Sequence, residues 1–219
     1  MSRAFAIGDI HGCTKTFRML LEEGIKIEKT DSIYCLGDYV DRGADSKGVV
    51  DYILAMRKKG YKIRTLRGNH EEIMMESGKS KANFKHWVKN GGKATLESFG
   101  VSSYSKLKPV YKNFFNETAF YFPVGKYLLV HAGFNFAAPN FKEDKEAMLW
   151  IRNFIINKEV LGNRIIVHGH TPVKLPVNNK NSNVINIDGG CVFNNVPGYG
   201  NLAALNLKTK ALILAKNVE

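Results

Sequence analysis

The sequence predicts an α/β (α+β) fold with a core of mixed β-sheet, in which two sheets pack face to face. In the first half, short apolar runs alternate with amphipathic stretches of helical length, which is the pattern of strand–loop–helix units. In the second half the apolar runs are more numerous, which is typical of further strands. The chain has 219 residues, a length that suits one domain, so we expect residues 1–219 to form a single domain.

The elements of the first half repeat the order strand, polar loop, helix. We expect strands at residues 3–7, 32–36 and 61–66, and helices at about 14–23, at 46–59 and in a long region that ends near residue 99. In the second half we expect a hairpin of residues 118–122 and 126–131 around Pro123-Val124-Gly125, a helix at about 143–158, and strands near 164–168, 184–188, 200–207 and 211–216.

The composition is that of a folded globular protein with an excess of positive charge. Hydrophobic residues make up 44% and charged residues 24%, which excludes a disordered chain, a coiled coil and a fibre. The 32 Lys and Arg exceed the 20 Asp and Glu by 12 charges, which points to an anionic partner without saying which. No apolar run is long enough for a membrane helix or a signal peptide, and the three cysteines form no disulfide framework. We therefore expect a cytoplasmic protein with no membrane partner, whose cysteines are buried.

Polar side chains that can bind metal ions recur directly after the expected strands, in loops that contain glycine. Each loop alone could be a turn or a helix cap, but ligands gather outside the carboxyl ends of strands in α/β sheets, so the loops together predict one site. Asp, His and Asn supply oxygen and nitrogen ligands, and no Cys stands at a matching position, which favours Mn, Fe or Zn in a hydrolytic role. The loops are Gly8-Asp9-Ile10-His11-Gly12, residues 37–43 (GDYVDRG), 68–71 (GNHE), 131–133 (HAG) and 168–171 (HGHT).

With these motifs in this order and at these separations, the chain resembles the phosphoprotein phosphatase (PPP) family of dinuclear metallophosphatases. HAG as the fourth motif, and HGHTP as the fifth, are similar to the small bacterial and phage branch of that family. The resemblance runs from about Ala4 to Phe193. It implies a calcineurin-like metallophosphoesterase fold, in which two mixed β-sheets are packed as a sandwich flanked by helices in four layers, αββα.

The resemblance also implies the metal ligands. The implied cofactors are two divalent metal ions, manganese in the first place, with iron or zinc as alternatives. His168 is interpreted as the structural end of a strand rather than a ligand. The implied ligands are Asp9 and His11 for the first ion, Asp38 as the bridge between both ions, and Asn69, His131 and His170 for the second.

The resemblance implies a reaction as well. A metal-bridging hydroxide would attack phosphorus in line, and His70, oriented by Asp41, would protonate the leaving oxygen as general acid. Arg42 and Arg152 would hold the phosphate oxygens; for Arg152 the less favoured alternative is an exposed helix arginine. The implied enzyme is a phosphomonoesterase that acts on phosphoserine or phosphothreonine, and also phosphotyrosine, of a protein or peptide, or on a small phosphoester. A dinucleoside polyphosphate hydrolase is the alternative on the same fold.

A lysine-rich stretch outside the motif loops supports another class of function. Residues 79–112 contain eight lysines and one acid, Glu97, which is +7 of the total charge of +12. Lys81, Lys85, Lys89 and Lys93 recur every four residues and would form one stripe on a helix, either as a solvated face or as a surface that steers acidic substrates. The alternative is a nucleic-acid-binding protein or a metallonuclease, which is disfavoured because the basic residues are not interleaved with aromatic ones as in RNA-binding motifs.

Overall fold

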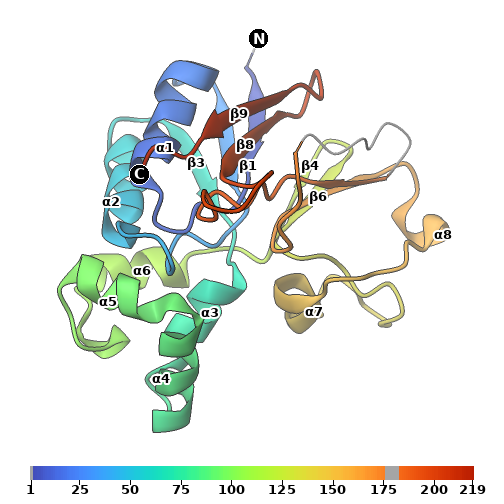
Figure 1. Ribbon diagram of the computed structural model, residues 1–219. Helices are drawn as coiled ribbons and strands as arrows, with labels where there is room; N and C mark the ends of the chain where they lie inside the picture. The colour runs from blue at the N-terminus through green and yellow to red at the C-terminus, as the bar shows by residue number, and fades with distance from the viewer. Residues whose placement is uncertain (1, 176–182) are drawn as a thin grey trace.

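The computed structural model describes residues 2–175 and 183–219, in which two β-sheets pack face to face between outer helices (Figure 1). The first sheet has the strand order β3-β2-β1-β8-β9 and the second has the order β4-β5-β6-β7. Helices α1 and α2 cover the outer side of the first sheet, and α7 and α8 lie beside the second (Figure 1). This arrangement confirms the predicted sandwich of two mixed sheets flanked by helices.

The first sheet combines parallel and antiparallel strands. β1, β2 and β3 are parallel, β8 runs antiparallel to β1, and β9 runs antiparallel to β8. α1, which continues as a π-helical turn over Leu20–Ile25, connects β1 to β2, and α2 connects β2 to β3. The elements are β1 (Ala4–Ile7), α1 (Thr14–Met19), β2 (Ser32–Cys35), α2 (Ser46–Lys58), β3 (Lys62–Thr65), β8 (Asn201–Asn206) and β9 (Leu212–Lys216).

The second sheet is built from a hairpin and two parallel strands. β4 (Tyr121–Val124) and β5 (Tyr127–Val130) form the antiparallel hairpin, and β5, β6 (Ile165–His168) and β7 (Val184–Asn186) are parallel. The turn of the hairpin lies at Gly125, which has a φ of 56°. Pro123 and Val124 lie within β4, so the predicted turn around Pro123-Val124-Gly125 begins too early. Proline fits there because β4 is an edge strand of the sheet.

Apolar side chains fill the space between the two sheets. Ala6 and Leu36 from the first sheet meet Leu129 and Val167 from the second, and all four are fully buried. A second apolar layer joins the outer face of the first sheet to α1 and α2, which explains why its parallel strands have apolar residues on both faces. The packing of both faces fixes the carboxyl ends of β1, β2, β3, β5 and β6 relative to one another.

The long helix predicted to end near residue 99 is divided into shorter helices. They are α3 (Asn69–Glu76), α4 (Lys81–Trp87), a π-helical turn over Val88–Gly92, and α5 (Lys93–Phe99). Ser80 begins α4, because its hydroxyl accepts a hydrogen bond from the Asn83 amide, and Gly91 has a φ of 106°. The predicted single stripe of lysines therefore does not lie on one continuous α-helix, although Lys81, Lys85, Lys89 and Lys93 are all exposed.

The helix predicted at residues 143–158 is also shorter than expected. α7 (Lys145–Trp150) begins where Asp144 caps the Ala147 amide, and it ends at Ile151, whose backbone is extended. A separate short helix, α8 (Lys158–Leu161), follows Asn157. Polar cap residues thus begin two helices where the apolar pattern predicted one. The prediction lacked α6 (Pro109–Asn116), which begins with proline, as many helices do.

A glycine that directly follows β1 allows a close approach between the two sheets. A Cβ atom built on Gly8 would lie 2.4 Å from the carbonyl oxygen of Ile187, which follows β7 of the other sheet. Only a residue without a side chain fits between these two backbones. Gly8 therefore allows the loop after β1 to lie beside the loop after β7.

We expect Gly8→Ala to lower the free energy of unfolding by about 1–3 kcal/mol, as other overpacking substitutions do. The matched control is Gly78→Ala, because Gly78 is exposed and a Cβ there meets no atom within 4 Å. Urea unfolding monitored by circular dichroism measures both variants. Equal stability of the two variants would contradict the close packing at Gly8.

Candidate active site

The five motif loops follow β1, β2, β3, β5 and β6, as the sequence predicted, and their side chains converge. Seven described non-glycine residues have a positive φ, and five of them are predicted site residues. This backbone conformation is uncommon for residues with a Cβ and is concentrated at functional sites. The surrounding packing must hold these five in place: they are His11, Asp38, Asp41, Arg42 and His170.

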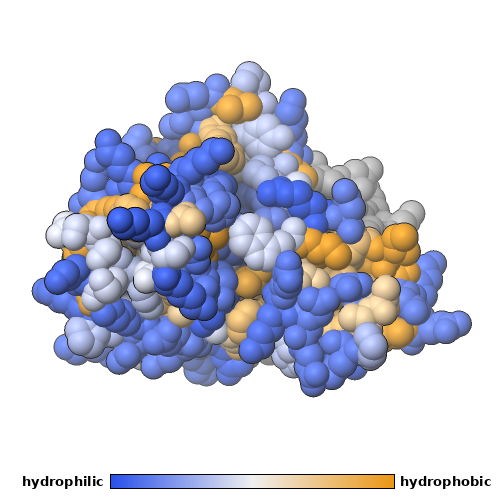
Figure 2. All heavy atoms as spheres, turned by 90° about the horizontal axis from the view of Figure 1, so that it is seen from below, coloured by the Kyte–Doolittle hydropathy of each residue, from blue (hydrophilic) through white to orange (hydrophobic). Residues whose placement is uncertain are grey.

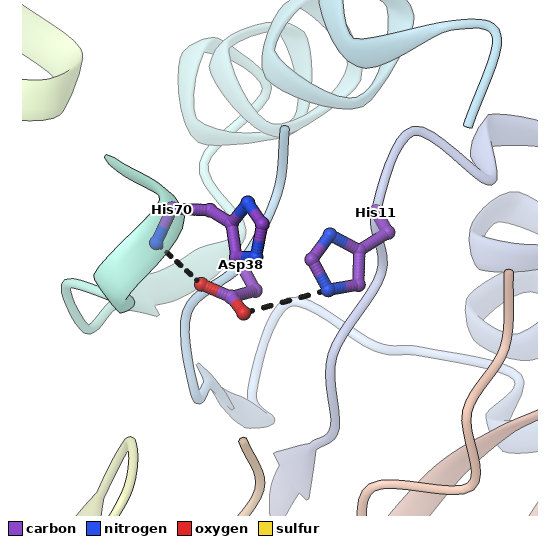
Figure 3. A group of neighbouring side chains, drawn as sticks. All are labelled: His11, Asp38 and His70. Atoms are coloured by element: carbon purple, nitrogen blue, oxygen red, sulfur yellow. Dashed lines mark hydrogen bonds and ion pairs between the residues drawn. The ribbon is translucent and has the colours of Figure 1, made fainter. Parts of the chain in front are cut away.

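The Asp38 carboxylate lies at the centre of the cluster (Figure 3). Its Oδ2 is 3.4 Å from Nε2 of His11, and its Oδ1 accepts a hydrogen bond of 3.1 Å from the backbone amide of His70. Oδ1 is also 3.6 Å from Nε2 of His131. All four residues are buried. Asp38 therefore faces two imidazole nitrogens and one backbone amide, which come from three different loops.

Two groups of side chains could each hold a metal ion. His11, Asp38 and His70 form the first group, and Asp38, His131 and His170 form the second; within each group the potential ligand atoms lie within 4.8 Å of one another. The two groups share Asp38, which is the residue predicted to bridge two ions. These buried groups are consistent with a dinuclear metal site.

The two other predicted ligands lie against these groups. Asn69 Oδ1 is 2.9 Å from Nε2 of His131 and 2.8 Å from Nδ1 of His170. Asp9 Oδ2 accepts a hydrogen bond of 3.0 Å from the backbone amide of His170. The structure thus brings together all six predicted ligands, and their roles as ligands stay predictions.

Unpartnered atoms at this site fit a bound cation. Among the described residues, three buried side-chain oxygen or nitrogen atoms lack a hydrogen-bond partner, and two of them are Asp9 Oδ1 and His170 Nε2. His131 Nδ1 lies 3.0 Å from the carbonyl oxygen of Leu36, so Nδ1 carries the proton and Nε2 directs its lone pair at the Asn69 oxygen. Two facing acceptors are unfavourable unless a cation binds both.

Burial favours the neutral form of three histidines of the site, His11, His131 and His170, as metal binding requires. It lowers the pKa of His11 well below its usual value, lowers the pKa of His131, and lowers that of His170 to about 3. Burial opposes ionisation of Asp38, but its electrostatic interactions with His131, His70 and His11 hold its pKa well below the usual range. The site therefore presents neutral imidazoles around an ionised carboxylate.

Burial disfavours the charged form of two other carboxylates of the site, Asp9 and Asp188. Burial, together with the charges of Asp188 and Asp38, raises the pKa of Asp9 well above its usual value. Burial also raises the pKa of Asp188 to about 7. Three buried aspartates close together repel each other unless cations are present, which is the second observation that fits a metal site.

Glu71 supports two of the loops. Its carboxylate accepts hydrogen bonds of 2.8 Å from the backbone amides of Asp38 and Tyr39 and one of 2.9 Å from that of Gly68. The loop after β2 and the loop after β3 are therefore held together by one side chain. Burial and the charge of Asp38 raise the pKa of Glu71 to about 8.

His70 and Asp41 form the predicted pair. His70 Nδ1 is 2.8 Å from Asp41 Oδ2, and both side chains are buried. Burial lowers the pKa of His70, but the charges of Asp38 and Asp41 outweigh it, so the pKa is raised. The surroundings of His70 therefore favour its protonated form more than those of a free imidazole do.

The residues that hold Asp41 were not predicted from the sequence. The indole nitrogen of Trp87 donates to both carboxylate oxygens at 3.0 and 3.1 Å, and the Thr95 hydroxyl donates at 2.6 Å. Trp87 and Thr95 lie on α4 and α5, outside the motif loops. Asp188 was also missed, although its position before Gly189-Gly190 at the end of a strand repeats the pattern of the other loops.

The two predicted arginines lie at the exposed rim of the site. Arg42 Nη1 is 2.6 Å from Nε2 of His11, and its guanidinium stacks over the Phe193 ring. Arg152 follows α7 and donates a hydrogen bond of 3.3 Å to the Thr171 hydroxyl in the last motif loop. Both side chains are exposed and can reach a bound anion.

Comparison with known proteins agrees with this geometry. The sequence model of the family described as calcineurin-like phosphoesterases matches residues 2–200. A cold-active protein-tyrosine phosphatase from a psychrophilic Shewanella has the same fold, with a TM-score of 0.67 at 17% identity over 98% of this chain and 78% of that one.

Curated relatives are named either as a protein phosphatase or as bis(5'-nucleosyl)-tetraphosphatases. A serine/threonine-protein phosphatase 1 from Salmonella typhimurium is 27% identical over 86% of this chain and 87% of its own length. An asymmetrical bis(5'-nucleosyl)-tetraphosphatase, PrpE, from Bacillus subtilis is 27% identical over 86% of each chain. A symmetrical bis(5'-nucleosyl)-tetraphosphatase from Buchnera aphidicola is 40% identical, but the match covers 31% of this chain and only 23% of the relative's length.

We expect the chain to bind about two equivalents of Mn²⁺ after treatment with a chelator, and Asp38→Asn to bind fewer and more weakly, because Asp38 belongs to both ligand groups. Isothermal titration calorimetry measures stoichiometry and affinity. Asp51→Asn is the control, since Asp51 pairs with Lys47 on α2. Unchanged Mn²⁺ binding by Asp38→Asn would exclude the bridging role.

Proposed function

The chain belongs to the calcineurin-like phosphoesterase family, and we propose that it is a metal-dependent hydrolase of phosphomonoesters or of the phosphoanhydrides of nucleotides. The observation that carries the proposal is the Asp38 carboxylate shared by two buried histidine groups, with the His70–Asp41 pair beside it. When bound, two divalent ions supply positive charge for the phosphate and lower the pKa of water. Asp9, His11, Asp38, Asn69, His131 and His170 would hold them.

His70 is the proposed general acid. Its Nδ1 is occupied by Asp41, so Nε2 is left to donate a proton to the leaving oxygen. Asp41 cannot rotate away, because Trp87 and Thr95 hold both of its oxygens. The protonated imidazole therefore keeps one orientation toward the substrate.

Arg42 and Arg152 are the proposed phosphate-binding groups. In this structure Arg42 uses the His11 lone pair that a metal ion would need, so metal binding would release its guanidinium for the substrate. Arg152 lies across the site, next to the Thr171 loop. Two planar guanidinium groups can hold the phosphate oxygens, on which negative charge concentrates in the transition state.

Two substrate classes have support. A phosphorylated serine, threonine or tyrosine side chain is supported by the relative from Salmonella, which matches along most of this chain. A dinucleoside polyphosphate is supported by PrpE, which matches equally far. Nucleic acid has less support, since the lysines of residues 79–112 are not arranged on a single continuous helix.

The proposal is tested with a panel of substrates in Mn²⁺ and in chelator. The panel contains phosphoserine, phosphothreonine and phosphotyrosine peptides, diadenosine tetraphosphate, glycerol 2-phosphate and a single-stranded oligonucleotide. We expect Mn²⁺-dependent release of phosphate or nucleotide from at least one of the phosphoesters or the dinucleotide. Cleavage of the oligonucleotide alone, or no hydrolysis at all, would refute the proposed function.

We expect His70→Asn to lower kcat by about 10²- to 10⁴-fold, as the loss of a general acid does. The effect should be large for an alkyl phosphoester, whose leaving oxygen needs a proton, and smaller for p-nitrophenyl phosphate, whose leaving group is stable as an anion. Steady-state kinetics with both substrates and the metal content of each protein are measured. Together they distinguish His70 as a general acid from His70 as a metal ligand. Loss of bound metal in the variant would show that His70 acts as a ligand instead.

A further inference from the structure

A pocket of about 280 Å³ lies between α3, α4 and α7, outside the cluster of predicted ligands. These helices form the lower part of the molecule in Figure 1, and Figure 2 looks onto this face from below. The residues that line the pocket are Glu72, Ile73 and Glu76 from α3, Asn83 and His86 from α4, and Trp150 from α7.

The pocket is next to the proposed active site. α3 begins with Asn69 and His70, so Ile73 and Glu76 lie one and two turns beyond the proposed general acid on the same helix. The indole of Trp150 meets the imidazole of His170 edge to face, with ring centroids 6.3 Å apart. One wall of the pocket thus contacts a predicted metal ligand.

Trp150 exposes its indole at this place. The preceding residues of α7, Ala147, Met148 and Leu149, are buried, whereas Trp150 is 39% exposed. Exposed tryptophans beside a polar site are typical of surfaces that bind a ligand. Trp87, the other tryptophan of the chain, is in contrast 1% exposed and bonded to Asp41.

The chemistry of the pocket favours a neutral, planar group that donates hydrogen bonds. Trp150 and Ile73 provide aromatic and apolar surface, and Glu72, Glu76 and Asn83 provide acceptor oxygens. The charge of Glu72 is compensated by Arg67 at 3.0 Å and that of Glu76 by Lys79 at 2.6 Å, so the pocket is a poor site for a cation. No lysine or arginine lines it in the described part of the chain, so it is a poor site for a second phosphate as well.

We propose that this pocket binds the nucleobase of a nucleotide substrate, stacked on Trp150, with its exocyclic amino group directed at the oxygens of α3 and α4. The inference rests on the proposed function, because the phosphates of the same substrate would occupy the metal site. A volume of about 280 Å³ is just below the range of drug-sized pockets and suits a single ring system. The substrate class is therefore a dinucleoside polyphosphate rather than a phosphopeptide, because phosphoserine and phosphothreonine have no planar group and the ring of phosphotyrosine carries no hydrogen-bond donor for the oxygens of the pocket.

Trp150→Ala tests the proposal through substrate preference. We expect the ratio of kcat/KM for diadenosine tetraphosphate to kcat/KM for glycerol 2-phosphate to fall at least about tenfold, in the range found for loss of base stacking on an aromatic ring. Trp150→Phe should restore most of this ratio, because it keeps an aromatic face. Ile155→Ala is the control for a change in the same segment, since Ile155 is 91% exposed and does not line the pocket.

A binding measurement tests the same contact without turnover. AMP should quench the tryptophan fluorescence of the wild-type protein in a saturable way, and ribose 5-phosphate, which has no base, should not. Trp150→Phe should lose this quenching although it keeps the substrate preference, because the remaining Trp87 is buried.

The possible outcomes distinguish failure of the nucleobase pocket from failure of the proposed function. If the wild-type protein hydrolyses no member of the panel in Mn²⁺, the proposed function is wrong. If the protein is active but Trp150→Ala lowers kcat/KM for both substrates equally, or lowers it for phosphopeptides and not for the dinucleotide, the nucleobase pocket is refuted. The proposed function as a metal-dependent hydrolase then stands.

Discussion

The interaction on which the site depends is that of the Asp38 carboxylate with the histidines around it. Asp38 follows β2, and through its two oxygens it contacts His11 from the loop after β1, His70 from the loop after β3 and His131 from the second sheet. One carboxylate thus links loops of both sheets. Its removal would leave these loops without the negative charge that a cation shared between them requires.

The loops reach this arrangement only because the sandwich keeps them in an unfavourable backbone conformation. His11, Asp38, Asp41, Arg42 and His170 all have positive φ values, which cost free energy outside glycine. Glu71 offsets part of this cost by accepting hydrogen bonds from amides of two loops. Packing of the apolar layer between the sheets offsets the remaining cost of the backbone conformation, so the geometry of the site depends on the stability of the core.

Much of this architecture was predictable from the sequence, because short apolar runs and glycine-flanked polar loops are local patterns. The positions of the loops after five strands follow from these patterns, whereas the αββα layers and the set of six ligands follow from the resemblance to the metallophosphatase family. The breaks in the helices were not predictable from these patterns, since the Ser80 cap and the π-helical turn near Gly91 are set by single residues. The Trp87–Asp41 contact joins residues 46 positions apart, and no periodicity indicates it.

That contact has a further consequence for how the protein loses activity. The orientation of His70 depends on Trp87 and Thr95, which lie on α4 and α5, outside both sheets. Helices at the surface of a domain can open locally at a lower free energy than the core. With His70 as the proposed general acid, local opening of α4 and α5 on warming would lower the activity while the sheets and the metal-binding loops remain intact.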